Sequence, residues 1–451
     1  MKYTTIMVLT ACAGMATLGA AQAAVTADEA KQLSGSLTPL GAEKAGNQAG
    51  TIPAWDGGLK GGAPATGRRP DPYAAEKPLF TISAKNLDQY AEQLTDGVKA
   101  MLKKYPSSYR LDVYPTHRTA AAPQYVYDNT LKNAMRGKLV QSSAGPVPEG
   151  VFGGVPFPIP KTGLEIMWNH LLRWRGESLR IEGQQWLTTA DGKQVLTNDA
   201  IVLQNMPYYY KDASLDKFKQ EYWQVRVNTV APSIKVGEAI VGRENLNADR
   251  TQVWVYLPGQ RRVRKLPNSC CDTPTPQSSG LMSFDETQGW SGRLDRYDWK
   301  IVGKKEIFIP YNTNRLLQPN KHEVVLGQHY LNPDYVRWEL HRVWVLEGTV
   351  AQGKRHVSPR SRYYIDEDTW SIVLTDRWDG NNQLWKTNWT MPVAMPDLPG
   401  TVTTTFGYYD LLSGAWYAND LMNEKSIQYK LMPHMDDDVF TPDSMAGEGV
   451  R

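Results

Sequence analysis

Cysteine is scarce in this 451-residue chain, which has only Cys12, Cys270 and Cys271. Cys12 lies in an apolar leader, so two adjacent cysteines remain for the folded protein. A disulfide between neighbours closes a small ring and constrains little of the unfolded chain, and zinc requires more ligands than two thiols. Two ordinary thiols, or a pair oxidised incidentally, are favoured over a redox switch.

Long hydrophobic runs are absent except at the start of the chain. Lys2 precedes an apolar, small-residue run over residues 6–20, and Ala21-Gln22-Ala23 has the small-x-small pattern that a signal peptidase recognises. No later stretch approaches the roughly 20 apolar residues that span a bilayer. We therefore predict a signal peptide over residues 1–23 and a mature protein located in the periplasm, with association with the outer membrane left open.

A strong excess of one charge is also missing. The formal net charge is +3, and it falls to +2 without the leader because Lys2 is the only charged residue there. This balance excludes nucleic acid as a bulk electrostatic partner. The chain has 15 Trp and 23 Tyr against 8 Phe, and such amphipathic aromatics favour β-strands and ligand-contacting surfaces.

Motifs for metal, cofactor or nucleophilic chemistry are lacking as well. The seven His residues show no His-Glu-x-x-His spacing, and there is no Gly-x-Ser-x-Gly. Residues 348–354 resemble the start of a phosphate-binding loop, but Arg355 replaces the Ser or Thr that would hold magnesium. The sequence predicts no cofactor, no metal site and no catalytic residue.

Residues 24–160 form the first part of the mature chain, and we predict a loop-rich segment with amphipathic helices that packs on a sheet. Ser83 can cap a helix whose apolar residues recur at helical spacing from Leu87 to Tyr105. A second helix is predicted over residues 129–135. Thr162 can cap a third, with an apolar face that begins at Leu164.

Residues 161–451 are predicted to form the sheet domain, because a period of two replaces the helical period after Arg175. Residues 179–203 indicate a hairpin, residues 222–230, 253–257 and 336–346 further strands, and residues 363–390 a meander. The strands follow one another without helical crossovers. The fold class is therefore mainly β with some α, with an antiparallel sheet.

A basic ribbon of four cations follows one of these strands at Arg261, Arg262, Arg264 and Lys265. Cations on an edge strand protect it against aggregation. They can equally contact an acidic partner or an anionic lipid headgroup. The sequence leaves both interpretations open.

A group of acids near tryptophans follows the ribbon, and paired acids beside tryptophan are typical of glycosidases. The residues concerned are Asp285, Glu286, Asp295, Asp298, Trp290 and Trp299. Adjacent carboxylates in an extended segment point to opposite faces. Arg293 and Arg296 are close in sequence to Asp295 and Asp298 and can neutralise them. Structural ion pairing is therefore favoured over acid/base catalysis.

Several long motifs resemble the DUF1329 family of exported proteobacterial proteins. They are TPLGAEKAGNQAGTIPAW, WNHLLRWRG, VWVYLPGQRRVRKLP, FDETQGWSGRLDRYDWKIVGKKEIFIPYN and LNPDYVRWELHRVWVLEGT. The family is similar to the outer-membrane lipoprotein-sorting proteins of the LolA/LolB type. The resemblance implies a strongly curved antiparallel sheet, or half-barrel, wrapped around helices, with an apolar cavity for acyl chains. It also implies an association with RND-type lipid exporters, but no reaction.

These patterns lead to the hypothesis of a carrier or chaperone for a lipid or other hydrophobic molecule, accessory to a membrane transporter, with peripheral membrane contact. The predicted cavity residues are Trp254, Tyr256, Trp338, Leu340 and Trp344, although an ordinary sheet core explains them equally well. Arg261, Arg262 and Arg264 are predicted to contact headgroup or partner. The alternatives are a polysaccharide-binding protein or glycoside hydrolase, and an accessory protein that binds protein alone.

Overall fold

The computed structural model describes residues 25–59, 61, 68–266 and 271–448. The predicted signal peptide over residues 1–23 and Cys270 lie outside the described residues. Cys271 is disulfide-bonded. Within the described ranges, no helix combines the length and the apolar character that crossing a membrane requires.

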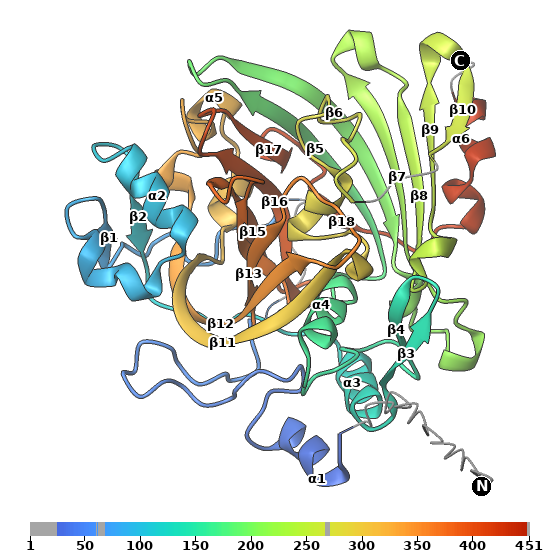
Figure 1. Cartoon of the computed structure of the whole chain (residues 1–451), viewed down its shortest axis with the longest axis horizontal. Coiled ribbons are helices and arrows are strands. Elements are labelled where there is room, and N and C mark those ends of the chain that lie inside the picture. The colour runs from blue at the N-terminus through green and yellow to red at the C-terminus, as the bar shows by residue number, and fades with distance from the viewer. Residues whose placement is uncertain (1–24, 60, 62–67, 267–270, 449–451) are drawn as a thin grey trace, which may run out of the picture.

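Most of the molecule is one large curved sheet (Figure 1). Its strands are β1 (Phe80–Ile82), β2 (Leu111–Val113), β5 (Ser178–Thr188), β6 (Gln194–Asn205), β7 (Glu221–Ala231), β8 (Ala239–Asn245), β9 (Gln252–Leu257), β10 (Arg262–Lys265), β11 (Tyr297–Pro310), β12 (Trp338–Val350), β13 (Arg360–Asp366), β14 (Ile372–Trp378), β15 (Leu384–Met395), β16 (Gly400–Asp410), β17 (Trp416–Leu421) and β18 (Tyr429–Leu431). A separate hairpin joins β3 (Lys138–Ser142) to β4 (Gly145–Glu149).

The strand order is β1-β2-β12-β13-β14-β15-β16-β17-β5-β6-β7-β8-β9-β10, with β11 on the free side of β12 and β18 beside β5. The two ends of this order do not pair with each other, so the sheet is open. All pairings are antiparallel except one short parallel contact between Val113 of β2 and Trp338 of β12. The prediction of a strongly curved antiparallel sheet is confirmed, with that one exception.

The predicted hairpin over residues 179–203 is confirmed as β5 and β6, which pair from Ser178 opposite Asn205 to Thr188 opposite Gln194. The basic ribbon forms β10, which pairs only with β9 and therefore ends the sheet. Arg262, Arg264 and Lys265 on it are exposed. Exposed cations on a terminal strand match the sequence expectation of a charged edge.

The helices are α1 (Ala27–Ala30), α2 (Asp96–Lys104), α3 (Gln124–Arg136), α4 (Gly163–Leu171), α5 (His322–Val325) and α6 (Pro442–Glu448). α4 begins as predicted, because Thr162 accepts a hydrogen bond from the Glu165 amide while the Glu165 carboxylate accepts one from the Thr162 amide. Ile166, Met167 and Leu171 then enter the largest hydrophobic core, together with residues of β5, β6 and β7.

The single helix predicted after Ser83 is wrong in one respect. The structure has a 3-10 helix over Leu87–Gln93, an extended residue at Leu94 and then α2. Thr95 explains the interruption, since its hydroxyl accepts a hydrogen bond from the Val98 amide and starts a new helix. A side-chain cap inside the periodic stretch competes with continuing the helix.

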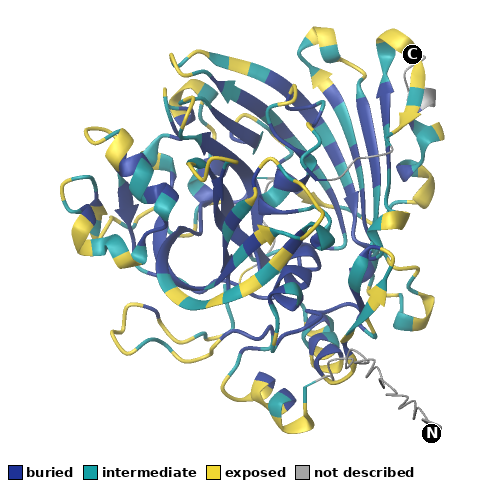
Figure 2. Ribbon diagram, viewed as in Figure 1, coloured by how far each residue is buried: buried dark blue, intermediate teal, exposed yellow. Residues whose placement is uncertain are grey.

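The described part of residues 24–160 runs along the sheet and contributes β1 and β2 to it (Figure 1). Exposed residues gather on its loops and on the hairpin tips, whereas the middle of the sheet is buried (Figure 2). Arg118 of this segment bonds both carboxylate oxygens of Asp368, at 2.9 and 2.7 Å, beyond the end of β13. Both side chains are almost fully buried.

Replacing Arg118 by Met is expected to lower the free energy of unfolding by about 3–5 kcal/mol, because Asp368 would remain buried without its partner. Urea denaturation followed by tryptophan fluorescence measures this change. Lys138→Met is the matched control, because Lys138 pairs with Glu149 and both side chains are about half exposed, and such surface pairs contribute about 0–1 kcal/mol. Equal, small effects of both substitutions would contradict the structural role of the Arg118 pair.

Candidate functional site

A cavity of about 130 Å³ lies between β6 to β9 and a long loop. We call residues 271–296 the covering loop, and the sheet face that carries this loop and α4 the inner face. The apolar side chains that line the cavity are Val202, Trp223, Val225, Val227, Ile240, Val253, Met282, Phe284 and Phe406. Ten polar residues, which carry amides, hydroxyls and two carboxyl groups, complete the lining, so apolar side chains lie beside polar groups that can orient a ligand.

Two smaller cavities, of about 10 and 50 Å³, continue from the first. Trp223 and Gln288 border both the large cavity and the first of these, and Tyr222 borders both small ones. Ser291 borders all three. The three cavities therefore form one row along the inner face, running from β16 to the turn between β3 and β4.

Buried polar contacts attach the covering loop to the sheet. Lys386 of β15 donates to both oxygens of Glu286 at 3.2 Å, and Asn388 donates to one of them at 3.3 Å. Burial alone would raise the pKa of Glu286, but Lys386 and Arg377 lower it to about 2. Asp285 lies 2.6 Å from Nε2 of His356. The loop is thus fixed at its 3-10 helix η8 (Phe284–Gly289).

Three of the four acids considered for glycosidase chemistry act as structural partners, and the fourth, Asp298, is exposed. Besides Asp285 and Glu286, Asp295 pairs with Arg293 at 2.9 Å and with Lys354 at 3.1 Å. Trp290 is 1% exposed and packs edge-on against Trp299. The preference for ion pairing is confirmed for Asp295, and these tryptophans do not form an open sugar platform.

Two carboxyl groups lie in the cavity lining. Burial raises the pKa of Glu244 to about 7, against a lowering by the Thr251 hydroxyl, which donates to it at 3.1 Å. Burial also raises the pKa of Asp420 to about 7. Near neutral pH both groups can therefore be protonated, which keeps the cavity compatible with an apolar ligand.

Trp254 and Tyr256, predicted to line the cavity, point away from it. Tyr256 packs with Val241, Phe440 and Met445 under α6, on the face opposite the covering loop, and Trp254 lies against the same cluster. The intervening Val253 lines the cavity instead. Alternate residues of a strand face opposite sides, so the inner-face residues of β9 are the valines.

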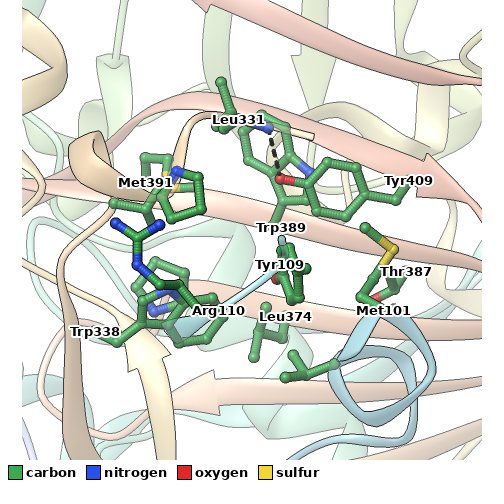
Figure 3. Close-up of a pocket in the computed structure, with 14 residues that line it drawn as sticks. Met101, Tyr109, Arg110, Leu331, Trp338, Leu374, Thr387, Trp389, Met391 and Tyr409 are labelled. Carbon is green, nitrogen blue, oxygen red and sulfur yellow. Dashed lines mark hydrogen bonds between the residues drawn. The ribbon is translucent and has the colours of Figure 1, made fainter. Parts of the chain in front are cut away.

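Trp338 borders a different pocket, of about 20 Å³, between α2 and the sheet (Figure 3). Met101 comes from α2, Trp389 and Met391 from β15, and the Tyr409 hydroxyl accepts a hydrogen bond from the Leu331 amide at 3.3 Å. Leu340 belongs to the same hydrophobic core. A pocket this small is nearly filled by its own side chains, as in an ordinary core.

Trp344 lies apart from both pockets. Its ring stacks on Trp370, with centroids 6.5 Å apart, and the Lys304 ammonium lies 4.7 Å from its centroid. The structure therefore brings Trp338 and Leu340 into one core, Trp254 and Tyr256 into a second, and Trp344 into a third environment. None of the five borders the large cavity.

Arg261 and the β10 arginines lie at the tip and edge of the β9–β10 hairpin, with Arg261 in the left-handed conformation. The neighbouring tip, between β7 and β8, packs Gly237 against Pro258 of this hairpin. That tip exposes apolar side chains, with Ile234 89% and Val236 51% exposed. An apolar tip beside a basic one suits contact with an anionic membrane surface.

One buried group offers metal-ligand atoms close together. His341, Asp366 and Asp368 place one such atom each within 4.8 Å of one another. Both oxygens of Asp368 already bond to Arg118, and Nε2 of His341 lies 3.1 Å from Glu339. These contacts suit a buried ion-pair network better than an open coordination site.

The sequence model of the family described as "Protein of unknown function (DUF1329)" matches residues 81–446. The chain belongs to the DUF1329 family. It is also 40% identical, over 462 residues and the full length of both chains, to an uncharacterized protein of Pseudomonas aeruginosa.

Solved structures with a similar arrangement include a DUF1329 family protein of Desulfovibrio piger. The two are 14% identical with a TM-score of 0.43, over 63% of this chain and 97% of that one. A LolA superfamily protein of Nitrosomonas europaea is 14% identical with a TM-score of 0.39, over 63% and 100% of the two chains. Since similar folds host many functions, the site is interpreted from its own geometry.

The sequence did not predict the cavity residues that come from segments far apart in the chain. Trp223 and Glu244 come from strands, whereas Gln288 comes from the covering loop. One signal was present: Arg173 and Arg175 follow α4 in the motif WNHLLRWRG, where two cations interrupt an apolar stretch. Both line the row of cavities.

Replacing Glu244 by Gln tests the character of the cavity. The folded protein keeps this proton up to about pH 7, while the unfolded chain releases it near the ordinary pKa of 4.5. Stability therefore falls as the pH rises between these values. The Gln variant is expected to match the wild type at pH 4 and to exceed its free energy of unfolding by about 1–3 kcal/mol at pH 8.

Urea denaturation at a series of pH values measures this effect. Glu92→Gln is the control, since Glu92 is exposed in the 3-10 helix before α2. A Glu244→Gln profile parallel to that of the wild type at every pH would contradict burial of this carboxyl group in an apolar cavity.

Proposed function

We propose that this DUF1329 protein is a periplasmic carrier or chaperone that binds a lipid or another hydrophobic molecule on the inner face of its sheet. The observation that carries the proposal is the row of three cavities between the sheet and the covering loop. Nine apolar side chains line the largest one, and the nearby acids Glu286 and Asp295 are engaged in structural pairs. Such a site supplies binding area and no activated nucleophile.

The size of the cavity bears on how a ligand enters. At about 130 Å³ it is smaller than the roughly 300–1,000 Å³ of typical ligand pockets, so a lipid chain requires part of the covering loop to move. Met282 and Phe284 rest on the cavity through apolar contacts, whereas Glu286 is fixed by charge. Each methylene that a ligand buries contributes about 0.8 kcal/mol, so several methylenes offset the displacement of those contacts.

The partner of such a carrier would be a membrane transporter that delivers or receives the ligand. The family resemblance points to RND-type exporters, and the two hairpin tips supply a surface for peripheral contact with the membrane. The exposed side chains of Ile234 and Val236 lie next to the hairpin of Arg261, Arg262 and Arg264. This arrangement joins an insertion surface to a headgroup-binding one.

Filling the cavity is expected to abolish ligand binding. Val227 lies on β7 and faces the cavity, so Val227→Trp should weaken the binding of a fluorescent acyl probe at least tenfold. Val302→Trp is the matched control, because the same change is made at a half-exposed position on β11 that does not line the cavity. Titration with the probe measures both affinities, and melting curves confirm that both variants fold. Unchanged probe affinity in folded Val227→Trp would contradict the site.

Removing the basic tip is expected to weaken contact with membranes. Each cation near an anionic surface contributes about 1 kcal/mol, so replacing Arg261, Arg262 and Arg264 by Gln should reduce binding to vesicles that contain phosphatidylglycerol by roughly 100-fold at low salt. Vesicle flotation measures the bound fraction.

The control for this experiment removes the same number of charges elsewhere. Lys85, Lys103 and Lys132 are exposed on the N-terminal segment, and their replacement by Gln should leave flotation unchanged. Equal losses in the two triple variants would show that net charge, and not the hairpin tip, determines membrane contact.

A further inference from the structure

Two arginines are buried where α4 leads into β5. Arg173 is 4% exposed and Arg175 is 7% exposed, and both border the small cavity that adjoins the large one through Trp223 and Gln288. The Arg175 guanidinium lies 4.7 Å from the centroid of the Trp223 ring. Two permanent positive charges therefore lie at one end of the apolar cavity.

The partners of these arginines are neutral. Arg173 donates from Nη1 to the His170 carbonyl at 2.7 Å and from Nη2 to Oε1 of Gln288 at 2.5 Å. Arg175 donates from Nη1 to the same Oε1 at 2.7 Å. Two guanidinium groups thus converge on one amide oxygen. Among the described residues, neither arginine has a carboxylate within ion-pair distance.

Three other buried arginines of this protein differ in this respect. Arg69 pairs with Asp397, Arg118 with Asp368 and Arg337 with Glu339. Burying a cation is costly without a counter-ion, and burial together with the neighbouring Arg175 lowers the pKa of Arg173 well below its ordinary value. The Arg173–Arg175 pair is therefore a buried pair of cations whose shared acceptor is a neutral amide oxygen, and that Gln288 oxygen occupies the position that an anion oxygen would take.

The covering loop supplies that oxygen from a strained position. Gln288 has a positive φ of 51°, a conformation that costs a residue with a side chain on the order of 1 kcal/mol. It lies two residues after Glu286, which fixes the loop to β15. Rotation of the Gln288 side chain would withdraw the amide and open the two guanidinium groups to the cavity, while Glu286 holds the loop backbone on β15.

We propose that Arg173 and Arg175 bind the anionic group of an amphipathic ligand, a carboxylate or a phosphate monoester, while its hydrocarbon chain fills the adjoining cavity. In this structure the Gln288 amide oxygen occupies the position of that group. This inference rests on the proposed carrier function and specifies its ligand class. Two convergent guanidinium groups match the planar carboxylate and the phosphate oxygens in geometry and charge.

Gln288→Glu tests the inference by supplying the anion from the protein itself. The carboxylate should pair with both arginines, raise the melting temperature and weaken binding of dodecanoate and dodecyl phosphate at least tenfold, while binding of dodecanol stays within twofold. Gln277→Glu is the matched control, since Gln277 borders the same large cavity but not the one that contains the arginines. A buried charge without a partner should lower its melting temperature.

Calorimetric titration of the wild-type protein with the three C12 probes separates the ligand sources. Tighter binding of dodecanoate identifies a fatty-acid type of ligand, and tighter binding of dodecyl phosphate identifies a phosphate headgroup. If dodecanol binds as tightly as both anions, or if Gln288→Glu lowers the melting temperature as Gln277→Glu does, the anion site is wrong while the carrier function stands. If none of the three probes binds, both proposals fail.

Discussion

An open, strongly curved sheet leaves an apolar inner face, and covering that face is the constraint on which the rest of this structure depends. α4 covers part of it, and the covering loop covers the remainder. The loop stays in place because Glu286, Lys386 and Arg377 form a buried group of charges on the sheet. Buried ion pairs add little net stability, but they tolerate only one arrangement of their partners.

The difference between the charged and the apolar contacts of the covering loop explains where the cavities lie. The charged contacts fix η8, whereas the apolar part of the loop around Met282 rests on Phe406 and the neighbouring tyrosines without charge. Space remains between that apolar part and the valines of β7 and β9. A hydrophobic ligand could replace weak, non-directional contacts there without disturbing the charged ones. The cavity lining and the Arg173–Arg175 pair together favour a molecule with one apolar and one anionic end.

Local periodicity was sufficient to predict much of the sheet. Alternation over residues 179–203 predicted a hairpin, and the cations after Leu257 indicated an edge strand as one of two open interpretations, since both signals depend on near neighbours. Periodicity could not predict which side chains of β9 face the cavity. The sequence of β9 is apolar on both sides, because α6 covers Tyr256 and the inner face covers Val253. α6 lies near the other end of the chain, so nothing local distinguishes the two faces.

The site itself was less predictable than the fold. Arg173 and Gln288 are separated by 115 positions, and only the path of the covering loop brings them together. Asp285 and Glu286, which suggested catalysis in the sequence, are the residues that attach that loop to the rest of the structure. Their clustering therefore reflects a structural role. Long motifs identified the family correctly, because a resemblance of that length does not depend on assigning a role to any one residue.

Native mass spectrometry of the protein purified under mild conditions tests the central claim most directly. We expect a population heavier than the chain alone by the mass of one hydrophobic molecule. This molecule should be released when the protein unfolds and should be identifiable in a solvent extract of the unfolded protein. Recovery of the empty chain alone, in repeated preparations that also fail to take up an acyl probe, would contradict it.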